Sequence, residues 1–287
     1  MLAKITIVCF AASYGVALLL EVSRLFFRLP VRLMVMLGFG AAGLVAHTLY
    51  LWNHAIGASG VPFSSWHLWF LLAAWLLAAI YLGLAASRPQ SSIGIFTLPV
   101  VLALVLAAQL SDPQAGFKRD EARTIWEGVH GLALLLGTVT TALGFVVGLM
   151  YLVQSYRLKH KLLPRPGFRL PSLEWLQTIS KQMLYVSAIL VAIGVFAGVV
   201  LNLIRGVIQW TDPLILSSGG LLIWLFAATL FELLYKPAQQ GRKVAYLTIA
   251  NFIFLAAVLW IVLFSNTQHA TANPAALLPG SRTEGRA

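Results

Sequence analysis

Long apolar runs alternate with short polar segments along almost the whole chain. Runs of roughly 18 or more mainly apolar residues, the length that a helix needs to cross a bilayer, occur in eight places. One run contains Pro99, which is tolerated because neighbouring helices can satisfy the freed carbonyl. The pattern predicts an all-α, polytopic integral membrane protein with about eight transmembrane helices, at about residues 4–23, 31–52, 66–86, 92–110, 128–153, 182–204, 215–235 and 244–265.

The two ends of the chain differ from its middle. The run 4–23 has the apolar stretch of a signal peptide, but no A-x-A cleavage site precedes a soluble domain, and the run is about long enough to span. We therefore expect it to remain as the first transmembrane helix. The last residues are small and polar with Pro and Gly, which favours disorder. The expected organisation is one transmembrane domain over 1–270 and a disordered tail over 271–287.

Composition agrees with a membrane protein, because 60% of the residues are hydrophobic and only 10% are charged, against about 25% in soluble domains. The net charge of +11 would suit a nucleic-acid binder, but basic residues of membrane proteins gather in cytoplasmic loops. Most Lys and Arg residues follow the first, third, fifth and seventh runs. We therefore expect no nucleic-acid partner, both termini on the outer side, and a multi-pass protein of the cell inner (plasma) membrane.

Histidine is the residue type whose placement adds most to this picture. In the expected orientation five of the six histidines lie toward the outer face, and only His160 is cytoplasmic. His130 opens the fifth run and His269 follows the eighth, while His54 and His67 are expected to be loop residues between the second and third. A single histidine at a helix mouth is usually an interfacial polar residue. Two from different helices at one depth can bind a haem iron from both sides.

The polar break VIQWTDPLIL, residues 207–216, separates the sixth and seventh runs. Tryptophan is common at membrane interfaces and Asp-Pro often opens a turn, so a structural role explains both. Alternatively, Trp210 stacks on a porphyrin and Asp212 accepts a hydrogen bond from a histidine ring, which fixes its tautomer. His47, a polar residue within the second run, either holds or relays haem or reaches the surface. The predicted haem site comprises axial ligands His130 and His269, with Trp210, Asp212 and His47.

Other kinds of chemistry find little support in the sequence. Cys9 is the single cysteine, which excludes disulfides, zinc clusters and CxxC chemistry within one chain. Metalloprotease, serine hydrolase, P-loop and dinucleotide motifs are missing, so we expect no enzyme. Polar residues are scarce within the runs, which disfavours a transporter. Glu21 and Glu232 lie near the ends of runs and are expected to pair with Arg24 or Lys236.

Several segments in order resemble the CcsA-like cytochrome c assembly proteins, and especially their shorter HemX-like branch. The resemblance covers most of the chain, from about His47 to His269. It rests on VAHTLYLW, SWHLWFLLAAWLLAAIYL, VHGLALLLGTVTTALGFVVGLMYLVQSYRLKHKL, LPSLEWLQTISKQMLYVSAILVAIGVFAGVVLNL, QWTDP, IWLFAATL, GRKVAYLTIANF and QHA. The tryptophan-rich motif is shorter than the family's, since LILSS follows QWTDP.

The resemblance implies that haem, expected as haem b, binds at the outer face. His130 and His269 match the histidines that flank the family's signature, Trp210 and Asp212 match its core, and His47 matches its membrane-embedded histidine. A part in cytochrome c maturation is implied, with apocytochrome c and a second assembly protein as partners besides membrane lipid. The HemX-like branch implies an alternative, a membrane scaffold or regulator that contacts a haem-biosynthesis enzyme and transfers no haem.

Overall fold

The computed structural model describes residues 6–26, 31–57, 65–111, 125–162, 167–205, 213–234 and 242–264. Each of the eight predicted runs overlaps one helix, in the same order, so the all-α prediction is confirmed. The helices are α1 (Ile7–Ser23), α2 (Arg32–Gly57), α3 (Trp66–Ser87), α4 (Gly94–Leu110), α5 (Ile125–Lys159), α6 (Leu173–Arg205), α7 (Pro213–Leu234) and α8 (Arg242–Phe264).

Helix length and composition support a multi-pass membrane protein. Six helices, namely α2, α3, α5, α6, α7 and α8, are long and apolar enough to cross a membrane. The other two, α1 and α4, are apolar but have 17 residues each, which corresponds to about 25 Å at ~1.5 Å per residue and is at the lower limit for a span. Eight spans with both termini outside therefore stay a prediction.

Two helices, α5 and α6, are much longer than their apolar runs predicted. α5 continues to Lys159 and α6 begins at Leu173, so most of the expected polar loop between them is helical. At the start of α6, the Trp175 N–H donates to Ser172 Oγ at 3.4 Å, which satisfies one free backbone donor of the first turn. Hydropathy marks the part of a helix that lies in lipid, whereas capping and helix propensity set where the helix itself ends.

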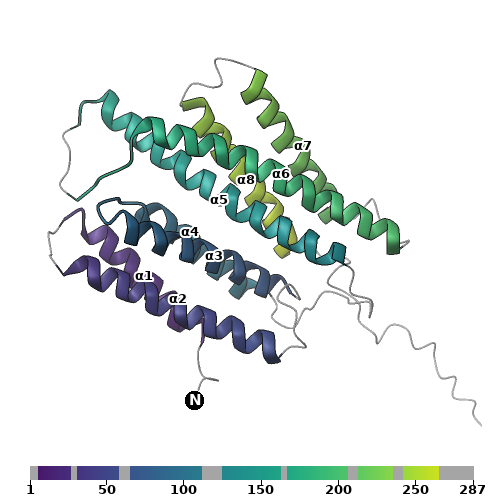
Figure 1. Cartoon of the computed structure of the whole chain (residues 1–287), viewed down its shortest axis with the longest axis horizontal. Helices are drawn as coiled ribbons and strands as arrows, with labels where there is room; N and C mark the ends of the chain where they lie inside the picture. The colour runs from purple at the N-terminus through teal and green to yellow at the C-terminus, as the bar shows by residue number, and fades with distance from the viewer. Residues whose placement is uncertain are drawn as a thin grey trace, which may run out of the picture.

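The helices form two groups that meet along α5 (Figure 1). In the first group α1 packs on α2 and α4, and α3 packs on α2 and α4. In the second, α5 packs on α6 and α8, while α7 lies at the edge against α6 and α8. Because α5 also contacts α3 and α4, it joins the two groups. His47 therefore lies in the first group and His130 in the second.

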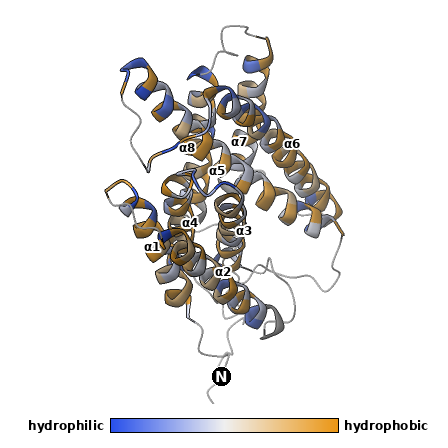
Figure 2. Cartoon of the chain, turned by 60° about the vertical axis from the view of Figure 1, so that its left-hand side comes forward, coloured by the Kyte–Doolittle hydropathy of each residue, from blue (hydrophilic) through white to orange (hydrophobic). Residues whose placement is uncertain are grey.

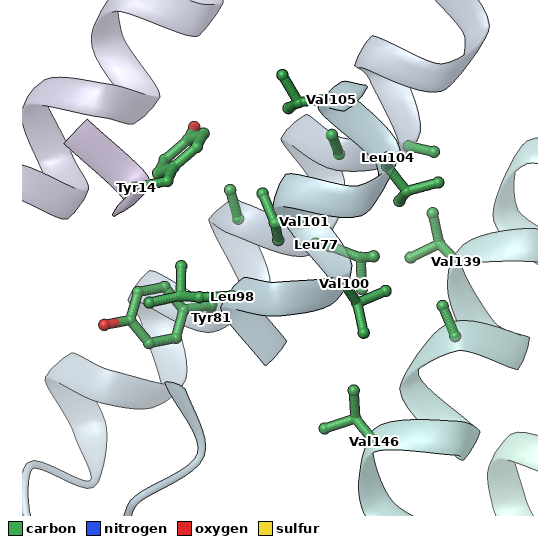
Figure 3. Close-up of a cluster of buried hydrophobic side chains, with 14 of the residues drawn as sticks. Tyr14, Leu77, Tyr81, Leu98, Val100, Val101, Leu104, Val105, Val139 and Val146 are labelled. Atoms are coloured by element: carbon green, nitrogen blue, oxygen red, sulfur yellow. The ribbon is translucent and has the colours of Figure 1, made fainter. Parts of the chain in front are cut away.

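The main hydrophobic core lies between α1, α3, α4 and α5. Phe70, Leu77, Leu98 and Val101 are fully buried in it. Val139 of α5 approaches Leu77 and the valines of α4 from the second group (Figure 3). On the outward faces of α6 and α7, by contrast, large apolar side chains are exposed. The helices are coloured hydrophobic along most of their length, with hydrophilic residues mainly toward their ends (Figure 2). This distribution suits helices whose outer faces contact lipid.

Glycines let α5 approach its neighbours closely, and Gly148 is the tightest case on the α8 side. A Cβ added at Gly148 would clash with Thr248 Oγ1 and would lie 3.1 Å from the Ala245 carbonyl oxygen. The second of these atoms belongs to the α8 backbone, so it cannot rotate away. Small residues at such contacts are how membrane helices pack without a hydrophobic driving force between them.

Replacing Gly148 by leucine is expected to force α8 away from α5 and to lower the free energy of unfolding by about 1–3 kcal/mol, the usual cost of overpacking. Thermal unfolding of the detergent-purified protein, followed by light scattering, measures it. Gly83→Leu is the matched control, because a Cβ at Gly83 meets no atom within 4 Å. Equal stability of the two variants would contradict the close α5–α8 contact.

Candidate functional site

His130 is held by a contact between α5 and α6. It lies in the second turn of α5, half-buried, and its Nδ1 is 2.7 Å from the Gly194 carbonyl oxygen of α6. Since a carbonyl oxygen only accepts, Nδ1 carries the proton and donates to it. The neutral ring then has its lone pair on Nε2. This is the tautomer that metal-ligating histidines usually adopt when a carbonyl orients them.

The ring of His130 lies against a glycine of α6. A Cβ added at Gly198 would lie 2.8 Å from both Cε1 and Nδ1 of the ring, and one added at Gly194 would lie 2.6 Å from Leu134 Cδ2. These glycines are one helical turn apart, so they open one face of α6 to α5. The motif GVFAG that contains them, a small-xxx-small pattern, is the sequence signal that could have located this contact.

Trp126 is a second aromatic side chain beside His130. The two residues are four apart in α5, which places them on one face of the helix. The Trp126 ring packs edge-on against Phe196 of α6, with ring centroids 6.3 Å apart. The sequence predicted a stacking role only for Trp210, because spacing within α5 does not reveal which face of this helix meets α6.

His47 is completely buried, so the alternative that it reaches the surface is wrong. Its ring stacks on Phe10 of α1, with centroids 4.1 Å apart and planes inclined by 2°. The Tyr14 hydroxyl is 3.3 Å from its Nδ1. Its Nε2 has no hydrogen-bond partner in the part of the chain that the structure describes. In the tautomer whose Nδ1–H donates to the Tyr14 hydroxyl, Nε2 carries a lone pair in an enclosed position between α1 and α2.

His54 and His67 lie in helices, so their expected loop positions are wrong. His67 is buried in the first turn of α3; its Nδ1–H donates to the Ala108 carbonyl at 2.7 Å, and its Nε2 lies 3.3 Å from the Tyr50 hydroxyl. His54 stacks on Tyr50, with centroids 4.2 Å apart. Both nitrogens of His67 are therefore engaged in joining α3 to α4 and α2, a structural role.

The structure thus divides the histidines into separate environments. Phe10 and Tyr50, whose centroids are 5.7 Å apart, connect His47 to His54 and His67, whereas His130 lies between α5 and α6. Within the described ranges, no three His, Cys, Asp or Glu side chains come close enough to hold a metal ion. Trp210, Asp212 and His269 lie outside the described residues, as does the expected tail 271–287.

The two carboxylates near helix ends have different partners from one another. Glu21 forms the expected ion pair with Arg24, at 3.6 Å. Glu232 pairs with Lys181 of α6 at 2.9 Å, whereas Lys236 lies outside the described residues. The expected Glu232–Lys236 pair assumed a partner nearby in sequence. The observed pair instead joins α7 to α6.

The described residues fit a haem better at His130 than at His47. His130 is half-buried near a helix end, and its tautomer places a lone pair on Nε2, the nitrogen that would bind iron. The Nε2 of His47 has no hydrogen-bond partner among the described residues, but the complete burial of this side chain leaves no room for a porphyrin beside it. The residues therefore fit axial ligation by His130, whereas haem at His47 requires the α1 side chains to move.

Comparison with known proteins bears on most of the chain. The family model described as cytochrome c assembly protein matches residues 38–269, which include His47, His130 and the segment 206–212. No curated protein matches the chain significantly, and the same is true of solved structures.

Proposed function

The chain belongs to the cytochrome c assembly protein family, and we propose that it handles haem at the outer face of the cell inner membrane during cytochrome c maturation. The family match is the observation that carries this proposal. Six apolar helices supply the membrane context. The carbonyl-oriented His130 supports a haem ligand near one end of the bundle.

In this proposal His130 is one axial ligand and His269 is the other. The Gly194 carbonyl holds the His130 ring and its tautomer, and Trp126 flanks the same face of α5. Trp210 would stack on the porphyrin, and Asp212 would orient a ligand. Haem b is cargo here, and filling both axial positions would protect its iron until apocytochrome c arrives. We propose no catalytic residue, because the chain's task is to hold and pass on its cargo.

His47 is proposed as a second holding or relay point within the membrane. Its unpartnered Nε2 supports this role, and its enclosure by Phe10 and Tyr14 implies that α1 must shift when haem arrives. The expected partners are a second assembly protein and apocytochrome c at the outer face. Both termini are proposed to lie on that side, as the distribution of basic residues favours.

A second candidate function is a HemX-like scaffold that contacts a haem-biosynthesis enzyme. The extension of α5 beyond its apolar run favours it, because Lys159 and His160 are exposed there. Such a basic projection, on the side expected to be cytoplasmic, offers a surface to a soluble enzyme.

Deleting the gene in the source organism separates the two functions. For haem handling we expect loss of haem-staining c-type cytochromes, with normal levels of tetrapyrrole precursors. Restoring the full chain should restore the cytochromes. Altered precursor levels with normal cytochromes would instead support the scaffold and contradict a role in haem handling.

A further inference from the structure

The end of the bundle opposite His130 carries a basic site that the proposed function does not use. The segment 88–93, between α3 and α4, packs against residues 167–171, which precede α6. The backbone N–H of Ser92 donates to the Arg169 carbonyl at 2.9 Å, and the Ser92 hydroxyl donates to the Gly167 carbonyl at 3.2 Å. Two segments far apart in sequence are thereby fixed to each other.

Arg24 fixes the same loop from the side of α1. Its guanidinium donates to the carbonyl of Ser91 at 2.9 Å and to that of Pro89 at 3.1 Å. Gly167, with φ +101°, packs directly on the Arg24 carbonyl, where a Cβ would clash. Arg24 therefore serves the structure of this region, and its charge is balanced by Glu21.

Two other arginines border a pocket between these segments. Arg88 and Arg169 are exposed, and Arg169 donates to the side-chain oxygen of Gln90. The Arg88 guanidinium lies over the Trp175 ring, 4.7 Å from its centroid. The pocket is lined mainly by Arg88, Pro89, Gln90, Arg169, Leu170 and Pro171.

The positive charge of this pocket has no acidic partner in the part of the chain that the structure describes. In the described ranges, no carboxylate oxygen lies within 4.0 Å of a nitrogen of Arg88 or Arg169. Two guanidinium groups held on an ordered frame offer paired N–H donors to a phosphate. An anionic ligand would therefore complete the charge balance.

We propose that Arg88 and Arg169 bind the phosphate of an anionic phospholipid, and that Trp175 supports Arg88 in that position. The pocket lies where α3 ends and α4 begins, and because the apolar runs of both helices also stop there, we expect it at the level of the lipid headgroups. Leu170 and the two prolines give it apolar walls that suit the glycerol and upper acyl region of a lipid. Basic pockets between transmembrane helices commonly hold such headgroups.

The test uses the full-length protein in detergent and measures bound lipid by native mass spectrometry. We expect dioleoyl phosphatidylglycerol to bind at least about tenfold more tightly than dioleoyl phosphatidylcholine. The double variant Arg88→Gln/Arg169→Gln should lose about tenfold in phosphatidylglycerol affinity, since charge-assisted paired contacts carry it. Arg88→Lys/Arg169→Lys keeps the charges but loses the paired N–H donors of the guanidinium groups. Its affinity for phosphatidylglycerol should lie between those of the unmodified protein and the glutamine double variant.

A matched control removes two exposed lysines elsewhere at the same end. Lys159→Gln/Lys243→Gln has the same change in net charge and should bind phosphatidylglycerol like the unmodified protein. Elution of all variants as one monodisperse species shows that they are folded. Equal affinity of the two glutamine double variants would overturn the proposal.

Inorganic phosphate distinguishes the two sources of this ligand chemistry. If a lipid headgroup is the ligand, millimolar phosphate should leave phosphatidylglycerol binding within about twofold of its value without phosphate, because the apolar walls add to the lipid's affinity. Complete competition by inorganic phosphate would overturn the assignment to lipid and make this a site for free phosphate.

Discussion

The variant His130→Ala is expected to lose most of the haem that copurifies with the protein, by more than about tenfold, as removing a metal ligand or its support usually does. The Gly194 carbonyl positions the ring, and in the proposed site its Nε2 binds the iron. Alanine leaves no nitrogen in that position. Absorption spectra of the purified protein, oxidised and reduced, measure haem per chain from the Soret band. His160→Ala, at the opposite end of α5, is the control and should retain the original haem content.

A variant that keeps the imidazole tests the geometry more sharply. In Gly198→Ala, the new methyl group would lie 2.8 Å from two ring atoms of His130, so the ring must move away from α6. We expect lower haem content and a shifted Soret band, with the protein still folded. Gly15→Ala, where a Cβ meets no atom within 4 Å, is the matched control. Unchanged haem content in both His130→Ala and Gly198→Ala would rule out His130 as a ligand.

The order of the helices could be predicted from sequence because lipid imposes a simple rule. A spanning helix must be apolar over nearly its whole length, whatever its neighbours are. Each predicted run therefore overlaps one helix, and this includes the run that contains Pro99, which lies inside α4. The same rule does not predict the end of α5 or the start of α6, because both are polar and extend beyond the apolar runs. Helix ends of this kind depend on capping, as at Ser172.

The partners of polar side chains could not be predicted, because they come from other helices. His47 stacks on Phe10, and His67 donates to Ala108, contacts between residues 37 and 41 positions apart. Neither hydropathy nor local spacing contains that information. The position of His130 at the start of a helix was predictable, whereas its contact with Gly194 required knowing which face of α6 meets α5.

Replacing Lys181 by methionine is expected to lower the free energy of unfolding by about 3–5 kcal/mol, as breaking a buried ion pair usually does. Glu232 is fully buried in α7, and its carboxylate lies 2.9 Å from the Lys181 ammonium group. The Tyr185 hydroxyl donates to its other oxygen. Removing Lys181 leaves a carboxylate in an apolar environment without its countercharge. Thermal or SDS-induced unfolding of the detergent-purified protein measures the loss.

Replacing Glu232 by glutamine should lower the free energy of unfolding much less than replacing Lys181. This difference would identify the buried, unpaired carboxylate as the cause of the loss in Lys181→Met. In Glu232→Gln the amide oxygen can still accept from Tyr185, and Lys181, whose side chain is 27% exposed, can reach water with its ammonium group. The double variant Lys181→Met/Glu232→Gln should therefore recover most of the stability lost in Lys181→Met. Additive losses would show that the two residues do not interact.

The same variants test whether the Lys181–Glu232 pair, which joins α6 to α7, affects the proposed haem site near the start of α7. That helix begins at Pro213, directly after Trp210 and Asp212, and packs against α6 and α8. If Lys181 and Glu232 fix its position, Lys181→Met should lower haem content together with stability, and the double variant should restore both. Restored stability with haem content still low would mean that the charges act on haem binding apart from their effect on folding. Unchanged haem content in Lys181→Met would show that the start of α7 is positioned independently of this pair.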